Sequence, residues 1–140
     1  MKYSKATNYA LHTMVYLTLT PKGKTVGVDQ LAKIQSLSPT YLSKILTKLV
    51  KAGLIQSTPG VNGGYSIVRQ ASDISFLDVI QAIEGKSTFF NCSLEHEDDT
   101  SQGECLIEKV MIQSEERMKD ELNNTFIIDI ARQIEASNQS

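Results

Sequence analysis

The sequence predicts a mostly helical fold with one small β-hairpin: a winged helix-turn-helix followed by a long C-terminal dimerisation helix. Three observations support this prediction. An amphipathic helix begins at Ser38-Pro39, a glycine-rich turn between two alternating segments follows it, and an apolar stripe runs through residues 105–122. Helix periodicity, turn chemistry and strand alternation therefore occur in the order that a recognition helix and its wing require.

Residues 37–65 organise the first half of the chain. Ser38 is a favoured N-cap, and Pro39 suits the first helical position, where a missing N–H costs nothing. At 100° per residue, one face of the helix is apolar and the opposite face is basic and hydroxylic. The apolar face comprises Tyr41, Leu42, Ile45, Leu46, Leu49 and Val50, and the polar face comprises Thr40, Ser43, Lys44, Thr47, Lys48 and Lys51. Gly53 then favours a helix stop, and segments 54–58 and 65–68 flank the turn-rich residues 59–64, which predicts a hairpin.

Two further helices are expected before this one. Residues 7–19 have apolar positions at spacings of three and four and end before Pro21, and Val28, Leu31, Ala32 and Ile34 indicate a short second helix. A short helix, a tight turn and a longer helix form a helix-turn-helix, whose second helix has the diameter to enter a major groove.

The second half of the chain predicts three more helices and a long loop. Ser75 and Asp78 suit a capping box, and Gly85 a helix stop. Residues 86–104 are polar and acidic. A stripe of Ile107, Val110, Met111, Ser114, Met118 and Leu122 predicts a long helix, and Phe126, Ile127, Ile130, Ala131 and Ile134 predict a final one. The stripe fits a two-fold interface, since a palindromic operator requires a duplicated helix-turn-helix; packing within its own subunit remains an alternative.

We therefore divide the chain into a DNA-binding region, residues 1–70, and a region of connecting helix, sensor loop (86–104) and dimerisation helices, residues 71–140, which together form one domain. Charge follows the same division. Residues 1–70 hold nine bases and one acid, a net charge of +8, whereas residues 71–140 hold five bases and fifteen acids, a net charge of −10. A basic first half can neutralise phosphates while an acidic second half stays away from them.

Length and composition narrow the class of protein. The 140 residues can bury one modest core, and neither a membrane span nor a signal peptide is evident, so we expect a cytoplasmic protein with no membrane partner. We expect no enzyme, because there is no glycine-rich loop after a strand, no histidine pair at metal spacing and no nucleophile elbow. An interaction module, whose long helix docks a regulatory protein, remains an alternative.

Five segments together resemble a known family. They are SKATNYAL (4–11), SPTYL (38–42), LVKAGLI (49–55), GGY (63–65) and ISFLDVIQAIEG (74–85). They are similar to the Rrf-two type of bacterial winged-helix regulators, which includes iron–sulfur-cluster, nitric-oxide and cysteine-metabolism repressors. The resemblance implies a homodimeric repressor of transcription that responds to a redox, iron–sulfur or thiol signal. It also implies that the recognition helix lies in the major groove of a palindromic double-stranded DNA operator, with the wing near the minor groove.

The predicted DNA contacts come mainly from the recognition helix. Relatives often begin the wing with an arginine, whereas this chain has Pro59 there and no base in the loop. We therefore expect base recognition from the helix face, phosphate contacts from Lys5 and Lys48, and only backbone N–H groups and Asn62 from the wing. The predicted set is Lys5, Ser38, Thr40, Tyr41, Ser43, Lys44, Thr47, Lys48, Asn62 and Gly63.

The two cysteines are candidates for sensing. Sensor members of the family hold an iron–sulfur cluster with three cysteines in this loop, and only Cys92 and Cys105 remain here. His12 is the best non-cysteine ligand candidate, because it points away from the apolar face of its helix. Three interpretations stay open: a cluster bound by Cys92, Cys105 and His12; a reversible Cys92–Cys105 disulfide; or inert cysteines in a regulator without cofactor, controlled by a protein partner or small ligand.

Overall fold

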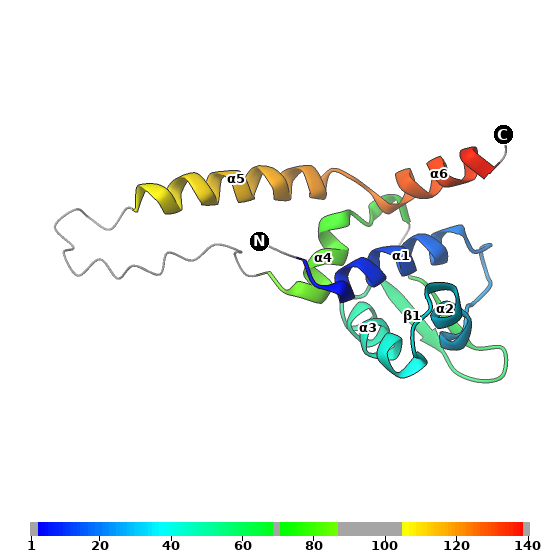
Figure 1. Cartoon of the computed structure of the whole chain (residues 1–140). Coiled ribbons are helices and arrows are strands. Elements are labelled where there is room, and N and C mark those ends of the chain that lie inside the picture. Colours follow the sequence, from blue (N-terminus) through cyan, green and yellow to red (C-terminus); the bar gives the residue numbers. More distant parts are fainter. Residues whose placement is uncertain (1–2, 69–70, 87–104, 139–140) are drawn as a thin grey trace.

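The computed structural model describes residues 3–68, 71–86 and 105–138 (Figure 1). In these ranges the chain forms helices and one hairpin. The elements are α1 (Lys5–Leu19), α2 (Val28–Gln35), α3 (Pro39–Lys51), β1 (Ile55–Thr58), β2 (Gly64–Ile67), the 3-10 helix η1 (Ala71–Asp73), α4 (Phe76–Glu84), α5 (Leu106–Asn123) and α6 (Ile127–Asn138). The predicted mostly helical fold with a winged helix-turn-helix is confirmed.

Local capping explains where the first helices begin and end. The Ser4 hydroxyl accepts a hydrogen bond from the Thr7 backbone N–H at 3.3 Å, so α1 begins at Lys5, two residues earlier than predicted. The turn between α2 and α3 passes through Ser36, whose φ of 56° lies in the left-handed region. The Ser38 hydroxyl accepts from the Tyr41 N–H at 3.2 Å, which confirms the predicted start of α3.

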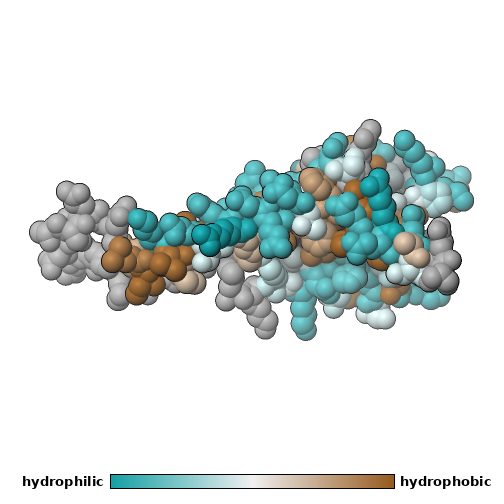
Figure 2. All heavy atoms as spheres, turned by 90° about the horizontal axis from the view of Figure 1, so that it is seen from above, coloured by the Kyte–Doolittle hydropathy of each residue, from teal (hydrophilic) through white to brown (hydrophobic). Residues whose placement is uncertain are grey.

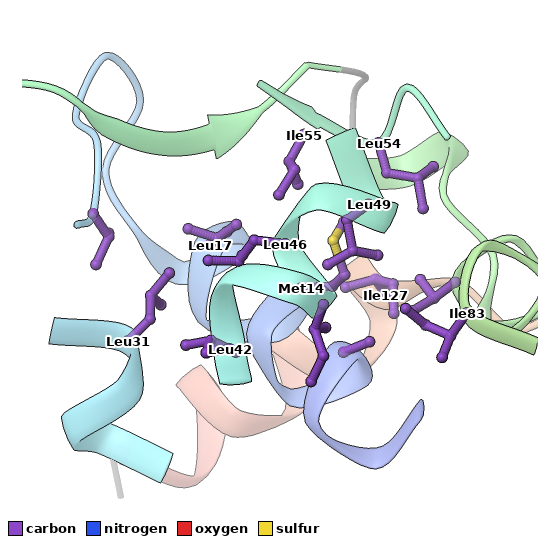
Figure 3. Close-up of a cluster of buried hydrophobic side chains, with 14 of the residues drawn as sticks. Met14, Leu17, Leu31, Leu42, Leu46, Leu49, Leu54, Ile55, Ile83 and Ile127 are labelled. Carbon is purple, nitrogen blue, oxygen red and sulfur yellow. The ribbon is translucent and has the colours of Figure 1, made fainter. Parts of the chain in front are cut away.

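The apolar face of α3 forms the centre of the core. Leu42, Ile45, Leu46 and Leu49 are buried in the core. Figure 3 shows Leu42, Leu46 and Leu49 beside Met14, Leu17 and Leu31 of α1 and α2. The edges of this face differ from the prediction, since Tyr41 is 38% and Val50 36% exposed. Tyr41 instead meets Tyr9 edge to face, with ring centroids 6.0 Å apart.

The hairpin is the predicted wing, but it has a third strand-like contact. β1 and β2 pair antiparallel with Ile55 opposite Ile67. Val26, just before α2, exchanges both backbone hydrogen bonds with Tyr65, at 3.0 and 2.8 Å. A Cβ on Gly64, whose φ is +147°, would lie 2.7 Å from the Val26 carbonyl group, so only glycine fits this approach. The wing is thereby fixed to the start of α2.

The remaining helices extend this body: α4 packs on both α1 and α3, α6 packs on α1, and α5 contacts α4. The predicted capping box between Ser75 and Asp78 is present, and α4 ends before Gly85. α5 begins one residue after Cys105 and runs beyond the body of the molecule (Figure 1). At its other end the chain returns to the body, because Phe76 N–H donates to the Thr125 carbonyl at 2.8 Å. The predicted loop of residues 86–104 lies outside the described residues apart from Lys86.

Candidate nucleic-acid interface

The solvent-facing side of α3 carries the predicted recognition residues. Thr40, Lys44, Thr47 and Lys48 are exposed and Ser43 is half-buried, while the opposite face is covered by the core. The Thr47 hydroxyl donates its proton to the Ser43 backbone carbonyl at 2.8 Å, so the hydroxyl oxygen keeps its lone pairs as acceptors. Ser38, also exposed, uses its hydroxyl to cap the helix. The structure therefore brings these predicted residues together on one ridge, of a width that a major groove admits.

The wing contributes backbone rather than charge. A Cβ on Gly63 would lie 2.0 Å from the Thr58 carbonyl oxygen, and its N–H is donated to the Gly60 carbonyl at 3.0 Å. Gly63 therefore has a structural role in the turn, and its contact with DNA stays a prediction. The exposed Asn62 accepts a hydrogen bond at its backbone carbonyl from the Thr25 hydroxyl, at 3.0 Å.

The hydrogen bond from Thr25 to Asn62 places the turn before Thr25 beside the wing, and this turn carries two lysines that are not among the predicted contacts. Lys22 and Lys24 are exposed in the turn before Thr25, and they line one surface hollow together with Asn62. The turn thus supplies positive charge beside a wing that has none of its own. The Thr25–Asn62 hydrogen bond and the pairing of Val26 with Tyr65 both join residues about forty positions apart, so spacing along the sequence gave no indication of this arrangement.

The other predicted phosphate contacts lie on two different helices. Lys5 is exposed in the first turn of α1, and Lys48 is exposed near the end of α3. Near Lys48 lies the carboxylate of Glu84. The Ser4 backbone N–H, the hydroxyls of Thr7 and Ser4 and the charge of Lys48 together hold the pKa of Glu84 below its ordinary value, against the opposing effect of burial.

The sensing candidates are only partly within the described chain. Cys92 lies outside it. Cys105 is half-buried at the N-cap of α5, and His12 is exposed on α1, with Nδ1 2.8 Å from the Asn8 carbonyl oxygen. Among the described residues, no three His, Cys, Asp or Glu side chains are grouped so that they could hold a metal ion. The described donors of one chain therefore do not fit a cluster by themselves.

The apolar stripe of α5 is divided between two environments. Toward the C-terminal end, Glu115 is buried and Met118 and Leu122 are half-buried against the body. At the N-terminal end, four apolar side chains are uncovered within the described chain: Leu106 is 73% exposed, Ile107 66%, Val110 61% and Met111 41%. Figure 2 shows this end of α5 as a continuous apolar patch. Packing against the described residues of its own subunit therefore accounts for only part of the helix. No helix of the described ranges is long and apolar enough to span a membrane.

Comparison with known proteins identifies the family. Residues 3–133 match the model of the Rrf2 family, described as an iron-dependent transcriptional regulator. The chain belongs to the Rrf2 family. YffB of Lactococcus lactis, described as an HTH-type transcriptional regulator, is 41% identical over 90 residues, which are 64% of this chain and 58% of YffB. The protein rrf2 of Nitratidesulfovibrio vulgaris is 28% identical over 132 residues, covering 94% of this chain and 88% of that one.

Solved structures share the fold over nearly the whole chain. CymR of B. subtilis, described as a global cysteine regulator, has a TM-score of 0.78 with 26% identity, covering 94% of this chain and 97% of CymR. IscR of T. potens also has a TM-score of 0.78, with 24% identity over 98% of this chain and 90% of IscR, and we use it for the fold alone. The family, with YffB and CymR, consists of transcriptional regulators and not enzymes, as expected from the sequence.

Proposed function

We propose that this Rrf2 protein is a sequence-specific DNA-binding regulator, acting as a homodimer on a palindromic operator. The observation that carries the proposal is the ridge of α3, on which exposed hydroxyl and ammonium groups stand opposite a buried apolar face. In the proposed complex, Lys44 donates to guanine O6 and N7, while Thr40, Ser43 and Thr47 contact base edges or thymine methyl groups. Residues 1–70 bind DNA and residues 71–140 set the dimer and receive the signal.

The phosphate contacts are proposed around this ridge. Lys48 lies near the C-terminal end of the ridge and Lys5 in the first turn of α1, while Asn62 with the neighbouring Lys22 and Lys24 lies at the wing. Contacts of this kind position the protein but carry no sequence information, so their loss weakens binding to every duplex alike. Lysines of the turn thus take the place of the wing arginine that this chain lacks.

A binding titration separates base contacts from phosphate contacts. Duplexes selected from genomic DNA are titrated by fluorescence anisotropy with the wild type, with Lys44→Ala and with Lys109→Ala, which removes an exposed lysine of α5. We expect Lys44→Ala to bind the selected duplex several-fold more weakly and to prefer it less over random DNA than wild type does, since a base contact contributes about 1–3 kcal/mol of discrimination. Unchanged binding would remove Lys44 from the interface, and wild type that selects no duplex in any redox state would refute the proposal.

For the signal, we propose reversible oxidation of Cys92 and Cys105. CymR of S. aureus, 27% identical to this chain with a TM-score of 0.74, has a solved oxidised form. Two thiols and one peroxide would give a disulfide and two waters, with the electrons passing to the peroxide. We expect a colourless protein whose count of free thiols falls by two on oxidation.

An iron–sulfur cluster is the second candidate, because the family model is described as iron-dependent. Its ligands would be Cys92, Cys105 and His12, the last from the partner subunit. Anaerobic purification followed by a visible spectrum distinguishes the two. Absorbance in the iron–sulfur region that disappears in Cys105→Ser would replace the thiol proposal, whereas its absence in protein isolated without oxygen would exclude the cluster.

A further inference from the structure

The carboxylate of Glu84 completes the N-terminus of a helix that lies far away in the sequence. Glu84 is the last residue of α4. Its Oε2 accepts hydrogen bonds from the Ser4 backbone N–H at 2.8 Å and from the Thr7 hydroxyl at 2.9 Å. Ser4 is the N-cap of α1 and Lys5 its first residue. A negative charge at this end is also favoured by the helix dipole, so Glu84 holds the turn that carries Lys5.

The residue before this cap extends the contact to α5. The Tyr3 hydroxyl donates to Met118 Sδ at 3.4 Å. Burial raises the pKa of Tyr3, and the negative charges of Glu84 and Glu115 raise it further. The N-terminal segment therefore joins α1 to the end of α4 and to the dimerisation helix at one point.

Glu84 also faces the recognition helix. It lines one surface hollow with Lys48 and Lys51, between the C-terminal ends of α3 and α4, and its charge is attracted by that of Lys48. The lysine side chain has three rotatable donors on a flexible stem, so a fixed carboxylate nearby limits where its ammonium group can lie. The carboxylate of Glu84 therefore binds the first turn of α1, which carries Lys5, and attracts the ammonium group of Lys48 on α3.

We propose that Glu84 is a positioning residue for DNA binding, which orders the Lys5 turn of α1 and orients Lys48 of α3 toward the phosphate backbone. The inference rests on the proposed function, because it concerns the same interface. Whether DNA binding becomes weaker or tighter when this carboxylate is removed distinguishes the two possible roles. A carboxylate close to DNA that did no positioning would repel phosphate, and its removal would tighten binding; a positioning carboxylate gives the opposite result.

Three variants test this role. Glu84→Ala removes both the acceptor and the charge, Glu84→Gln keeps an acceptor oxygen but removes the charge, and Glu135→Ala removes an exposed carboxylate of α6 as the matched control. We expect several-fold weaker DNA binding for Glu84→Ala, an intermediate value for Glu84→Gln, and a salt dependence reduced by about one phosphate contact. In the double variant with Lys48→Ala the two losses should be less than additive. Equal or tighter binding by Glu84→Ala would overturn the inference.

A measurement without DNA separates this inference from the proposed function. Hydrogen exchange of the backbone amides in the first turn of α1 should be faster in Glu84→Ala than in wild type, while core amides of α3 stay protected. If wild type binds no DNA, the proposed function is refuted and the positioning role with it, even where exchange changes. If wild type binds DNA and first-turn exchange is the same in the variant, the positioning role alone is refuted.

Discussion

Replacement of Val110 by aspartate tests whether the uncovered end of α5 is the dimer interface. Val110 lies between Ile107 and Met111 in the apolar stripe and is 61% exposed in the single chain. In a two-fold interface the same patch of both subunits is in contact, so each of its side chains is buried once in each subunit. A charge at this position would then be buried without a partner, whereas on a free surface it would be solvated at little cost.

The size of the effect follows from the exposed fraction. Complete burial of an apolar side chain of this kind contributes about 1.5–3 kcal/mol, so covering the 61% that is exposed would contribute about 1–2 kcal/mol per subunit, or about 2–4 kcal/mol per dimer. At about 1.4 kcal/mol for each factor of ten, its loss raises the dimer dissociation constant at least about 30-fold. The unpaired carboxylates add to this value.

Sedimentation velocity over a range of protein concentrations measures the dissociation constant. The matched control is Lys109→Gln, which makes the same change of −1 in charge on the same helix. Lys109 is exposed and lies two residues from both Ile107 and Met111, so it is on nearly the opposite side of α5. We expect Val110→Asp to be largely monomeric where wild type and control are dimers. Val110→Asp that dimerises like wild type, or a monomeric wild type, would refute this interface.

Three further results are expected. Gly64→Ala should destabilise the protein by about 1–3 kcal/mol in urea unfolding, because its Cβ would lie 2.7 Å from the Val26 carbonyl group at a positive φ. Gly27→Ala has open space around its Cβ and should cost less, because it loses only the preference for glycine over alanine at the N-cap of α2. Lys48→Ala should lower the slope of log affinity against log salt by about 1 for any duplex, and an unchanged slope would remove it from the phosphate contacts. The pKa of Glu84 is depressed, so the stability that its carboxylate contributes is present above its ordinary pKa of 4.5 and is lost as pH falls through the lower folded value. Wild type should therefore lose stability relative to Glu84→Gln in acid unfolding below about pH 4.5. Parallel unfolding curves of the two proteins would contradict this.

The sequence was most informative where structure is decided locally. Ser38 and Pro39 define the start of α3 through the capping bond and the first helical position, and the spacing of Leu42, Ile45, Leu46 and Leu49 predicted which face is buried. The same holds for the capping box of α4. In each case the interacting residues are three or four positions apart, so periodicity contains the information.

Contacts between distant segments were not predicted. Val26 pairs with Tyr65 through a single bridge, too short to give any alternating pattern, and this bridge brings Lys22 and Lys24 to the wing. Glu84 ends a helix whose own sequence indicates nothing about Ser4, eighty residues earlier. Such pairs depend on how helices pack, which composition and spacing do not specify. The DNA-binding residues and the ligand candidates remain predictions for the experiments above.

α5 is attached to the body at one end, so its orientation sets a distance in the proposed dimer. The connection after Asn123, the last residue of α5, is held to the body by two hydrogen bonds: Phe76 N–H donates to the Thr125 carbonyl at 2.8 Å, and Ile127 N–H donates to the Ile74 carbonyl at 2.9 Å. From Asn123 the 18-residue helix extends about 27 Å. A tilt of about 5° at the held end would move the far end by about 2 Å. In the proposed dimer, that end sets the distance between the two recognition helices, which must match half-sites about 34 Å apart. Operator choice could therefore be retuned by substitutions near Ile74 and Ile127, at residues that touch no base.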